Sequence, residues 1–151
     1  MKLIELIRPD SIYVDVDVDS KKNLFKNISN IFFQDDLQKG EMIIDKLNER
    51  ERLGSTGIGN GVAIPHSKTD LFEKTKVIFL KLKSAIDFSA SDNKDVDLIF
   101  VILAPSNSQS EHLLALSSIS NFLKKKNVIK KLRDLKRSED IHKFFKKFSE
   151  D

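Results

Sequence analysis

Residues 96–103 read VDLIFVIL, an almost uninterrupted apolar run that ends at Ala104-Pro105. A strand with one solvated face alternates apolar and polar side chains, whereas a continuous run is typical of a central strand covered on both faces. A second such run, VIFLKL, occupies residues 77–82. The two runs predict the centre of a sheet that has helices on both of its faces.

Shorter elements surround these two strands. An alternating strand is expected at Ile12–Val16, and residues 62–64 should be extended because Pro65 disfavours helical backbone at the residue before it. Helices are expected over residues 2–7, about 20–34, 41–53, 108–123, 127–135 and 139–148. The predicted class is therefore α/β, a mixed β-sheet of four to five strands sandwiched by helices on both faces, in a single domain spanning residues 1–151.

The composition narrows the class of protein. Hydrophobic residues make up 40% of the chain and charged residues 32%, which is typical of a globular protein. No apolar run approaches the ~20 residues of a membrane span, so no membrane insertion is expected. The N-terminus turns acidic at Glu5 and does not resemble a signal peptide. Cysteine is absent, which excludes disulfides and thiolate chemistry. The expected compartment is the cytoplasm.

Positive charge is concentrated near the C-terminus. The net charge is only +3, yet residues 124–147 contain eleven Lys and Arg against three Asp and Glu. Such a segment can bind nucleic acid or an anionic membrane surface, or it can be a solvated helical face. Phe144, Phe145 and Phe148 recur at helical spacing, as core residues do. This favours the solvated face, and no nucleic-acid partner is expected.

A glycine-rich segment, GSTGIGNG at residues 54–61, contains four of the five glycines and leads through VAIP to His66. Glycines allow close backbone approach, and Pro65 stiffens the segment before the histidine. Ser55 and Thr56 add hydroxyl groups, and Arg50 can bring a positive charge from the end of the preceding helix. An imidazole nitrogen, backbone N–H groups, hydroxyls and a guanidinium suit an anionic group such as phosphate.

The other histidines carry less information. If Ser108 and Glu111 form a capping box, His112 lies in the first turn of a helix, where free N–H groups favour phosphate; a polar residue without a role is the alternative. His142 lies in the basic segment and is interpreted as a surface residue. The glycine segment lacks the Lys-Ser/Thr ending of a P-loop and the dinucleotide spacing, and no histidine pair has zinc-binding spacing. No cofactor and no metal are expected.

Three blocks of sequence carry a family resemblance. They are RERLGSTGIGNGVAIPH at residues 50–66, SDNKDVDLIFVILAP at 91–105 and HLLALS at 112–117. Together they resemble the fructose/mannitol-type enzyme IIA family of the bacterial sugar phosphotransferase system, most closely its nitrogen-regulatory branch. The likeness covers nearly the whole chain in matching order. It implies a mixed sheet sandwiched by helices, in agreement with the prediction above.

The resemblance also implies roles for individual residues. His66 would accept a phosphoryl group through Nε2 from a histidine-phosphorylated carrier of the HPr type. Arg50 and His112 would flank that group, and Ser55 and Thr56 would hold the loop or the phosphate. Two features depart from or complicate the pattern: Ser67 stands where glycine is common, and Arg52 lies close enough to Arg50 to compete for the same place.

Three functions remain open at this point. The chain is expected to be a regulatory phosphocarrier that acts on a target protein, because no fused permease domain or linker accompanies it. A sugar-transport component that passes phosphate to a separate permease domain is the alternative. A binding module without phosphotransfer is the third reading, and the intact set of His66, Arg50 and His112 argues against it.

Overall fold

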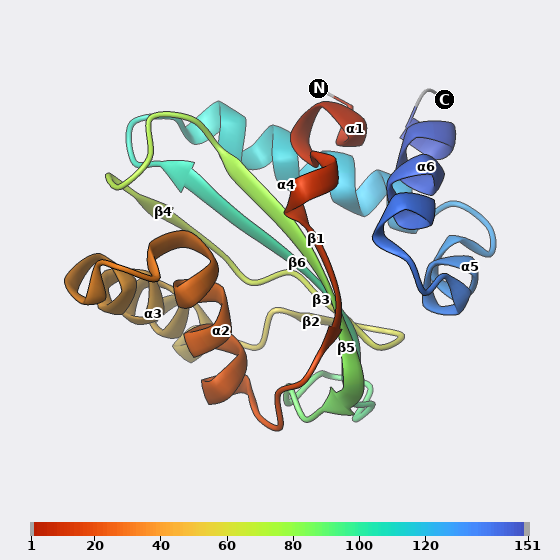
Figure 1. Cartoon of the computed structure of the whole chain (residues 1–151), viewed down its shortest axis with the longest axis horizontal. Coiled ribbons are helices and arrows are strands. Elements are labelled where there is room, and N and C mark those ends of the chain that lie inside the picture. The colour runs from red at the N-terminus through yellow and green to blue at the C-terminus, as the bar shows by residue number, and fades with distance from the viewer. Residues whose placement is uncertain (1, 150–151) are drawn as a thin grey trace.

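The computed structural model describes residues 2–149 and shows helices packed around a twisted sheet (Figure 1). Its elements, in chain order, are α1 (Leu3–Leu6), a 3₁₀ turn (Pro9–Ser11), β1 (Ile12–Val16), α2 (Lys21–Phe33), α3 (Leu37–Arg52), β2 (Gly57–Gly59), β3 (Val62–Ala63), β4 (His66–Thr69), β5 (Lys76–Ile86), β6 (Val96–Pro105), α4 (Gln109–Leu123), α5 (Val128–Asp134) and α6 (Ser138–Ser149).

The sheet is mixed. Five strands lie in the order β1-β5-β6-β3-β2, and β4 pairs with β6 outside this path. β5 runs antiparallel to β6, whereas β1 is parallel to β5, and both β3 and β4 are parallel to β6. The predicted α/β class is confirmed. The pairing of β4 adds one element to it: strand structure resumes at His66, which pairs with Ile102 of β6.

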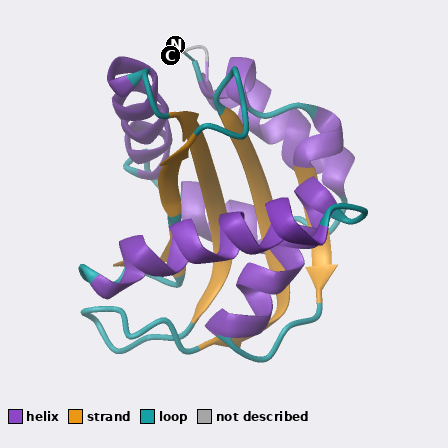
Figure 2. Cartoon of the chain, turned by 90° about the vertical axis from the view of Figure 1, so that its left-hand side faces the viewer, coloured by secondary structure: helices purple, strands orange, loops and turns teal. Residues whose placement is uncertain are grey.

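Helices cover both faces of the sheet, as Figure 2 shows from the side. α2 and α3 lie on one face, and α1, α4, α5 and α6 lie on the other. Strand β6 serves both sides: Leu98, Phe100 and Ile102 belong to one buried cluster, and the residues between them belong to the other. This alternation explains the continuous apolar run, because every side chain of a strand covered on both faces is buried.

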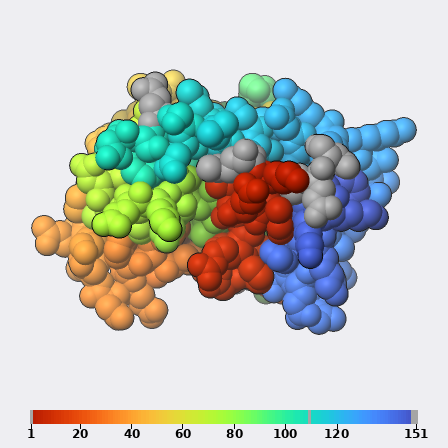
Figure 3. All heavy atoms as spheres, turned by 90° about the horizontal axis from the view of Figure 1, so that it is seen from above, coloured from red at the N-terminus to blue at the C-terminus, as the bar shows by residue number. Residues whose placement is uncertain are grey.

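The aromatic residues of α6 complete one of the two cores. Phe145 is fully buried, and its ring meets those of Phe79, Phe100 and Phe122 at centroid distances of 5.4, 6.0 and 5.3 Å. The basic residues of α6 therefore occupy the solvated side, as predicted. The short helix α1 lies against α6 and α4, which Figure 3 shows from above. No helix within residues 2–149 combines the length and apolar character needed to cross a membrane.

Helix α3 begins earlier than expected, at Leu37 rather than near residue 41. The Asp36 carboxylate accepts a hydrogen bond of 3.1 Å from the Lys39 N–H and so caps the helix. Gly40 lies inside this added turn because α2 packs closely there: a Cβ at Gly40 would lie 2.5 Å from the Ser29 hydroxyl oxygen. The extra turn extends the pairing of α2 with α3, the two helices behind the glycine-rich segment.

Candidate active site

His66 is the first residue of β4, and both of its ring nitrogens have defined partners. Nδ1 lies 2.7 Å from the carbonyl oxygen of Ile64. A carbonyl only accepts hydrogen bonds, so Nδ1 carries the ring proton and Nε2 is unprotonated, with a lone pair that can accept. Arg50 Nε donates to Nε2 at 3.3 Å. The fold therefore presents Nε2 as the unprotonated, nucleophilic nitrogen and places a guanidinium beside it.

The surroundings of His66 keep its imidazole neutral. Burial lowers its pKa below the ordinary 6.5, because the charged ring loses hydration, and the positive charge of Arg50 lowers it further. The hydrogen bond to the Ile64 carbonyl and the negative charge of Glu51 act in the opposite direction and are outweighed. A neutral imidazole at neutral pH has the lone pair that an attack on phosphorus requires.

Arg50 comes from the last turn of α3. Besides its contact with His66, its Nη1 donates to the Gly54 carbonyl at 2.8 Å, so the guanidinium also fixes the start of the glycine-rich segment. Arg52, two residues later, is exposed and lines a different depression, together with Lys22 and Lys26 of α2. Of the two arginines near the signature, the structure brings Arg50 to the histidine.

His112 comes from the first turn of α4, and its ring lies 5.1 Å from that of His66 between centroids. Its Nδ1 is buried and has no hydrogen-bond partner among the described residues. Burial lowers the pKa of His112, and the charges of His66 and Lys68 lower it further. A second neutral imidazole therefore faces the first, and its Nδ1 has not formed a hydrogen bond within the described residues.

The capping box predicted for α4 is wrong. Ser108 precedes the helix, but its side chain accepts no capping hydrogen bond. Glu111 instead accepts a hydrogen bond of 3.2 Å from the Thr75 hydroxyl, in the segment before β5. This tertiary contact replaces the local one and ties the first turn of α4 to the sheet, so His112 stays at the predicted place.

Ser55 and Thr56 support the loop. Ser55 Oγ donates to the Phe88 carbonyl at 2.5 Å and accepts from the Gly57 N–H at 3.0 Å. Thr56 is buried, and both its hydroxyl and its N–H donate to the Glu51 carboxylate. Of the two roles expected for this pair, holding the loop or holding phosphate, these contacts perform the first.

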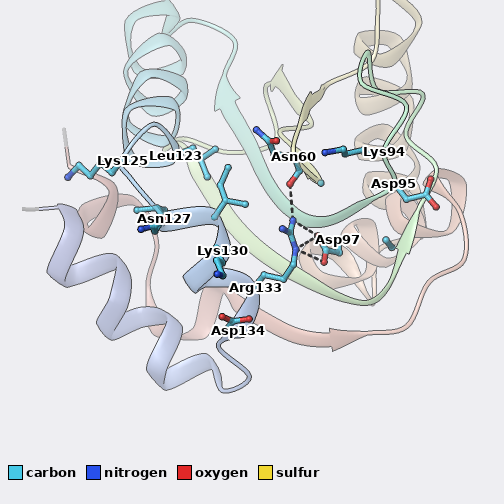
Figure 4. A pocket seen from close by; sticks show the side chains of 14 residues that line it. Asn60, Lys94, Asp95, Asp97, Leu123, Lys125, Asn127, Lys130, Arg133 and Asp134 are labelled. Atoms are coloured by element: carbon cyan, nitrogen blue, oxygen red, sulfur yellow. Dashed lines mark hydrogen bonds and ion pairs between the residues drawn. The ribbon is translucent and has the colours of Figure 1, made fainter.

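The tip of the β2–β3 hairpin is held by a residue that sequence reasoning assigned to a solvated face. Arg133 of α5 donates through Nε and Nη2 to the Asp97 carboxylate at 2.9–3.1 Å, and Nη2 also reaches the Asn60 carbonyl at 2.9 Å (Figure 4). The Asn60 N–H in turn donates to Asp92 at 2.9 Å. One signal was available in the sequence: Asp97 is a lone acid inside an apolar strand.

The surface around His66 forms a shallow depression with mixed walls. It is lined by Lys46, Glu49, Arg50, Leu53, His66, Ser67, Lys68 and His112. Its cationic side chains outnumber the single carboxylate, and its edge is apolar, because Leu53 is 84% exposed. On α4, Leu113 follows His112 directly and is 54% exposed. Open apolar groups beside a cationic centre suit an anionic group presented by another protein.

Within residues 2–149, no three His, Cys, Asp or Glu side chains are grouped so that they could hold a metal ion. What the site offers is a nucleophilic nitrogen, a guanidinium, a second imidazole and lysines, which together can receive and stabilise a phosphoryl group.

Comparison with known proteins places this geometry in context. The sequence model of the family described as "Phosphoenolpyruvate-dependent sugar phosphotransferase system, EIIA 2" matches residues 5–148. A nitrogen regulatory protein homolog of Haemophilus influenzae is 39% identical over 149 residues, which cover 96% of this chain and 91% of the relative. A nitrogen regulatory protein of Bradyrhizobium diazoefficiens is 34% identical and covers 94% and 93%.

Solved structures agree with the sequence relatives. The crystal structure of the nitrogen regulatory protein IIA-Ntr from Neisseria meningitidis superposes with a TM-score of 0.86 at 31% identity, covering 95% of this chain and 98% of that one. The sequence comparison and the structural comparison therefore indicate the same family of proteins.

Proposed function

The chain belongs to the EIIA 2 family of the phosphoenolpyruvate-dependent sugar phosphotransferase system, and from that membership we propose that His66 Nε2 is the atom that carries the phosphoryl group. The chain is a phosphocarrier of this system and a homologue of nitrogen regulatory protein IIA-Ntr. One observation carries the assignment of the atom: the Ile64 carbonyl holds the proton on Nδ1, so the lone pair on Nε2 faces Arg50.

The proposed step is an exchange of one P–N bond for another. The lone pair of His66 Nε2 attacks the phosphorus of a phosphohistidine on the donor. The donor's P–N bond breaks, and its electron pair stays on the donor nitrogen. Nδ1 keeps its proton throughout, held by the Ile64 carbonyl, so the imidazolium charge that develops is stabilised. The Arg50 guanidinium stabilises the phosphoryl oxygens, and His112 offers a further hydrogen-bonding nitrogen.

The family implies a donor of the HPr type and downstream partners. For this chain we propose docking of the donor on the depression around His66, supported by the exposed Leu53 and Leu113 that flank it. The two relatives described above, which cover 94–96% of this chain, are nitrogen regulatory proteins, and this favours a regulatory target protein over a sugar permease domain. We also propose that residues 1–151 form one domain and that the protein acts in the cytoplasm.

Intact mass spectrometry after incubation with a phosphorylated HPr-type carrier tests the proposal. Wild-type protein should gain one phosphoryl group, and His66→Ala should gain none. His142→Gln is the matched control, because His142 lies on α6, outside the site, and should behave as wild type. Phosphorylation retained in His66→Ala would place the acceptor elsewhere. Folded wild-type protein that gains nothing from a competent donor would favour the binding module.

A further inference from the structure

Glu51 follows Arg50 directly, and its carboxylate is almost entirely buried, with 7% of the side chain exposed. Its oxygens accept hydrogen bonds from the Thr56 N–H at 3.2–3.3 Å and from the Thr56 hydroxyl. Lys21 Nζ completes the set at 2.9 Å. A buried charge is tolerated only when it is paired and hydrogen-bonded in this way, so the burial of Glu51 depends on Thr56 and Lys21.

The contacts continue from Thr56 to the nucleophile. The Thr56 carbonyl accepts a hydrogen bond of 2.9 Å from the Ile64 N–H. The carbonyl of the same Ile64 accepts the Nδ1 proton of His66 at 2.7 Å. Glu51, Thr56, Ile64 and His66 are thus joined in series by hydrogen bonds. The series ends at the Ile64 carbonyl oxygen, which holds the proton on Nδ1 and so leaves Nε2 unprotonated.

The other end of the network is anchored to a different part of the chain. Lys21 Nζ also donates to the Phe88 carbonyl at 3.2 Å and lies 4.5 Å from the centroid of the Phe88 ring. Ser55 Oγ donates to that same carbonyl. Lys21 therefore links the Glu51 carboxylate to the segment after β5, and Ser55 of the glycine-rich segment binds the same carbonyl.

We propose that Glu51 is a positioning residue for phosphoryl transfer. By fixing Thr56 it holds the Ile64 carbonyl where it takes the Nδ1 proton, and it thereby keeps Nε2 unprotonated and directed at Arg50. The proposal rests on the proposed role of His66. The charge of Glu51 also acts on His66 directly, but its positioning effect passes through Thr56 and Ile64 by the hydrogen bonds described.

Glu51→Gln is the direct test: it preserves size, but whichever way its amide turns, the NH₂ group meets a group that can only donate, Lys21 Nζ on one side or the Thr56 N–H on the other. The rate at saturating phosphorylated donor should fall about 10- to 100-fold, as expected for a misplaced reacting group. The half-saturating donor concentration should stay unchanged, because the docking surface is untouched. Nitrogen NMR of the His66 ring should show one tautomer in wild type and a mixture in the variant.

Asp45→Asn is the matched control: it removes an exposed carboxylate from the same helix and should leave the rate and the tautomer unchanged. If Glu51→Gln does not fold, as judged by circular dichroism, Thr56→Val is measured by the same criteria, since it deletes the hydroxyl that Glu51 binds. A folded variant with the wild-type maximal rate and a single tautomer overturns the proposal. A lower rate with a raised half-saturating concentration and an unchanged tautomer also overturns it.

The ring measurement separates the two proposals. It needs no phosphoryl donor, so it reports on Glu51 even in a protein that accepts no phosphate. Wild-type protein that is not phosphorylated refutes the role of His66, whereas an unchanged tautomer in Glu51→Gln refutes only the role of Glu51.

Discussion

Replacement of Arg50 by lysine tests the electrostatics of the site. Arg50 donates from two nitrogens at once, Nε to His66 Nε2 at 3.3 Å and Nη1 to the Gly54 carbonyl at 2.8 Å. Lysine keeps the charge but has a single ammonium in place of the planar fork, so it cannot span both acceptors. A hydrogen bond from a charged group contributes about 1.5–3 kcal/mol. Once Nε2 bonds phosphorus, its lone pair no longer accepts from Arg50, so we expect the guanidinium to donate to two phosphoryl oxygens instead. Lysine loses one of these two contacts, which predicts a rate lower by roughly 10- to 150-fold.

The assay is rapid-quench measurement of phosphoryl transfer from a saturating, phosphorylated HPr-type carrier. Arg52→Lys is the matched control, since Arg52 is exposed and lies outside the depression around His66. The control should transfer at the wild-type rate. A rate for Arg50→Lys within about threefold of wild type would refute the reasoning, because charge alone would then suffice and the paired geometry of the guanidinium would contribute little.

Three further predictions concern pH and stability. Burial lowers the pKa of His66 and His112 below 6.5. Their neutral forms therefore stabilise the fold above pH 6.5, and this stabilisation is lost as the pH falls through the lowered pKa values. The free energy of unfolding measured in urea should decline from pH 7 to pH 5, and a flat profile would contradict this. Phe145→Ala should lower the free energy of unfolding by about 3–5 kcal/mol, because Phe145 is fully buried. An unchanged urea midpoint would show that its ring contacts contribute little to stability. Arg133→Met should cost about 1–2 kcal/mol and speed amide exchange at Asn60, whereas unaltered exchange would show that the hairpin tip does not depend on it.

Much of the fold could be read from local pattern. The apolar run at 96–103 predicted a strand covered on both faces, and its side chains do divide between two buried clusters. The glycine-rich segment and Pro65 predicted that His66 follows an extended stretch, and it begins β4. These predictions succeeded because the causes, burial on both faces and the conformational limits of proline and glycine, act on residues close together in the chain.

The missed features depend on partners that are distant in the chain. Glu111 fits a capping box by spacing, yet it bonds Thr75, 36 residues away. Arg133 resembles other cations of the basic segment, yet it pairs with Asp97, also 36 residues away. Glu51 has no local sequence signal of burial, and its carboxylate accepts a hydrogen bond from Lys21, 30 residues before it. Spacing along one segment carries no information about which remote donor or acceptor the fold brings near.

The pairing of β4 with β6 has a consequence for how the protein is made. His66 reaches its place by pairing with Ile102, and the ring that faces it belongs to His112 of α4. Contacts between residues so far apart close large loops, and their entropic cost delays them during folding. A nascent chain that has released only its first hundred residues contains His66, the proposed acceptor, but not Ile102, with which His66 pairs. We therefore expect the proposed competence to receive a phosphoryl group to appear only after β6 and α4 have joined the fold.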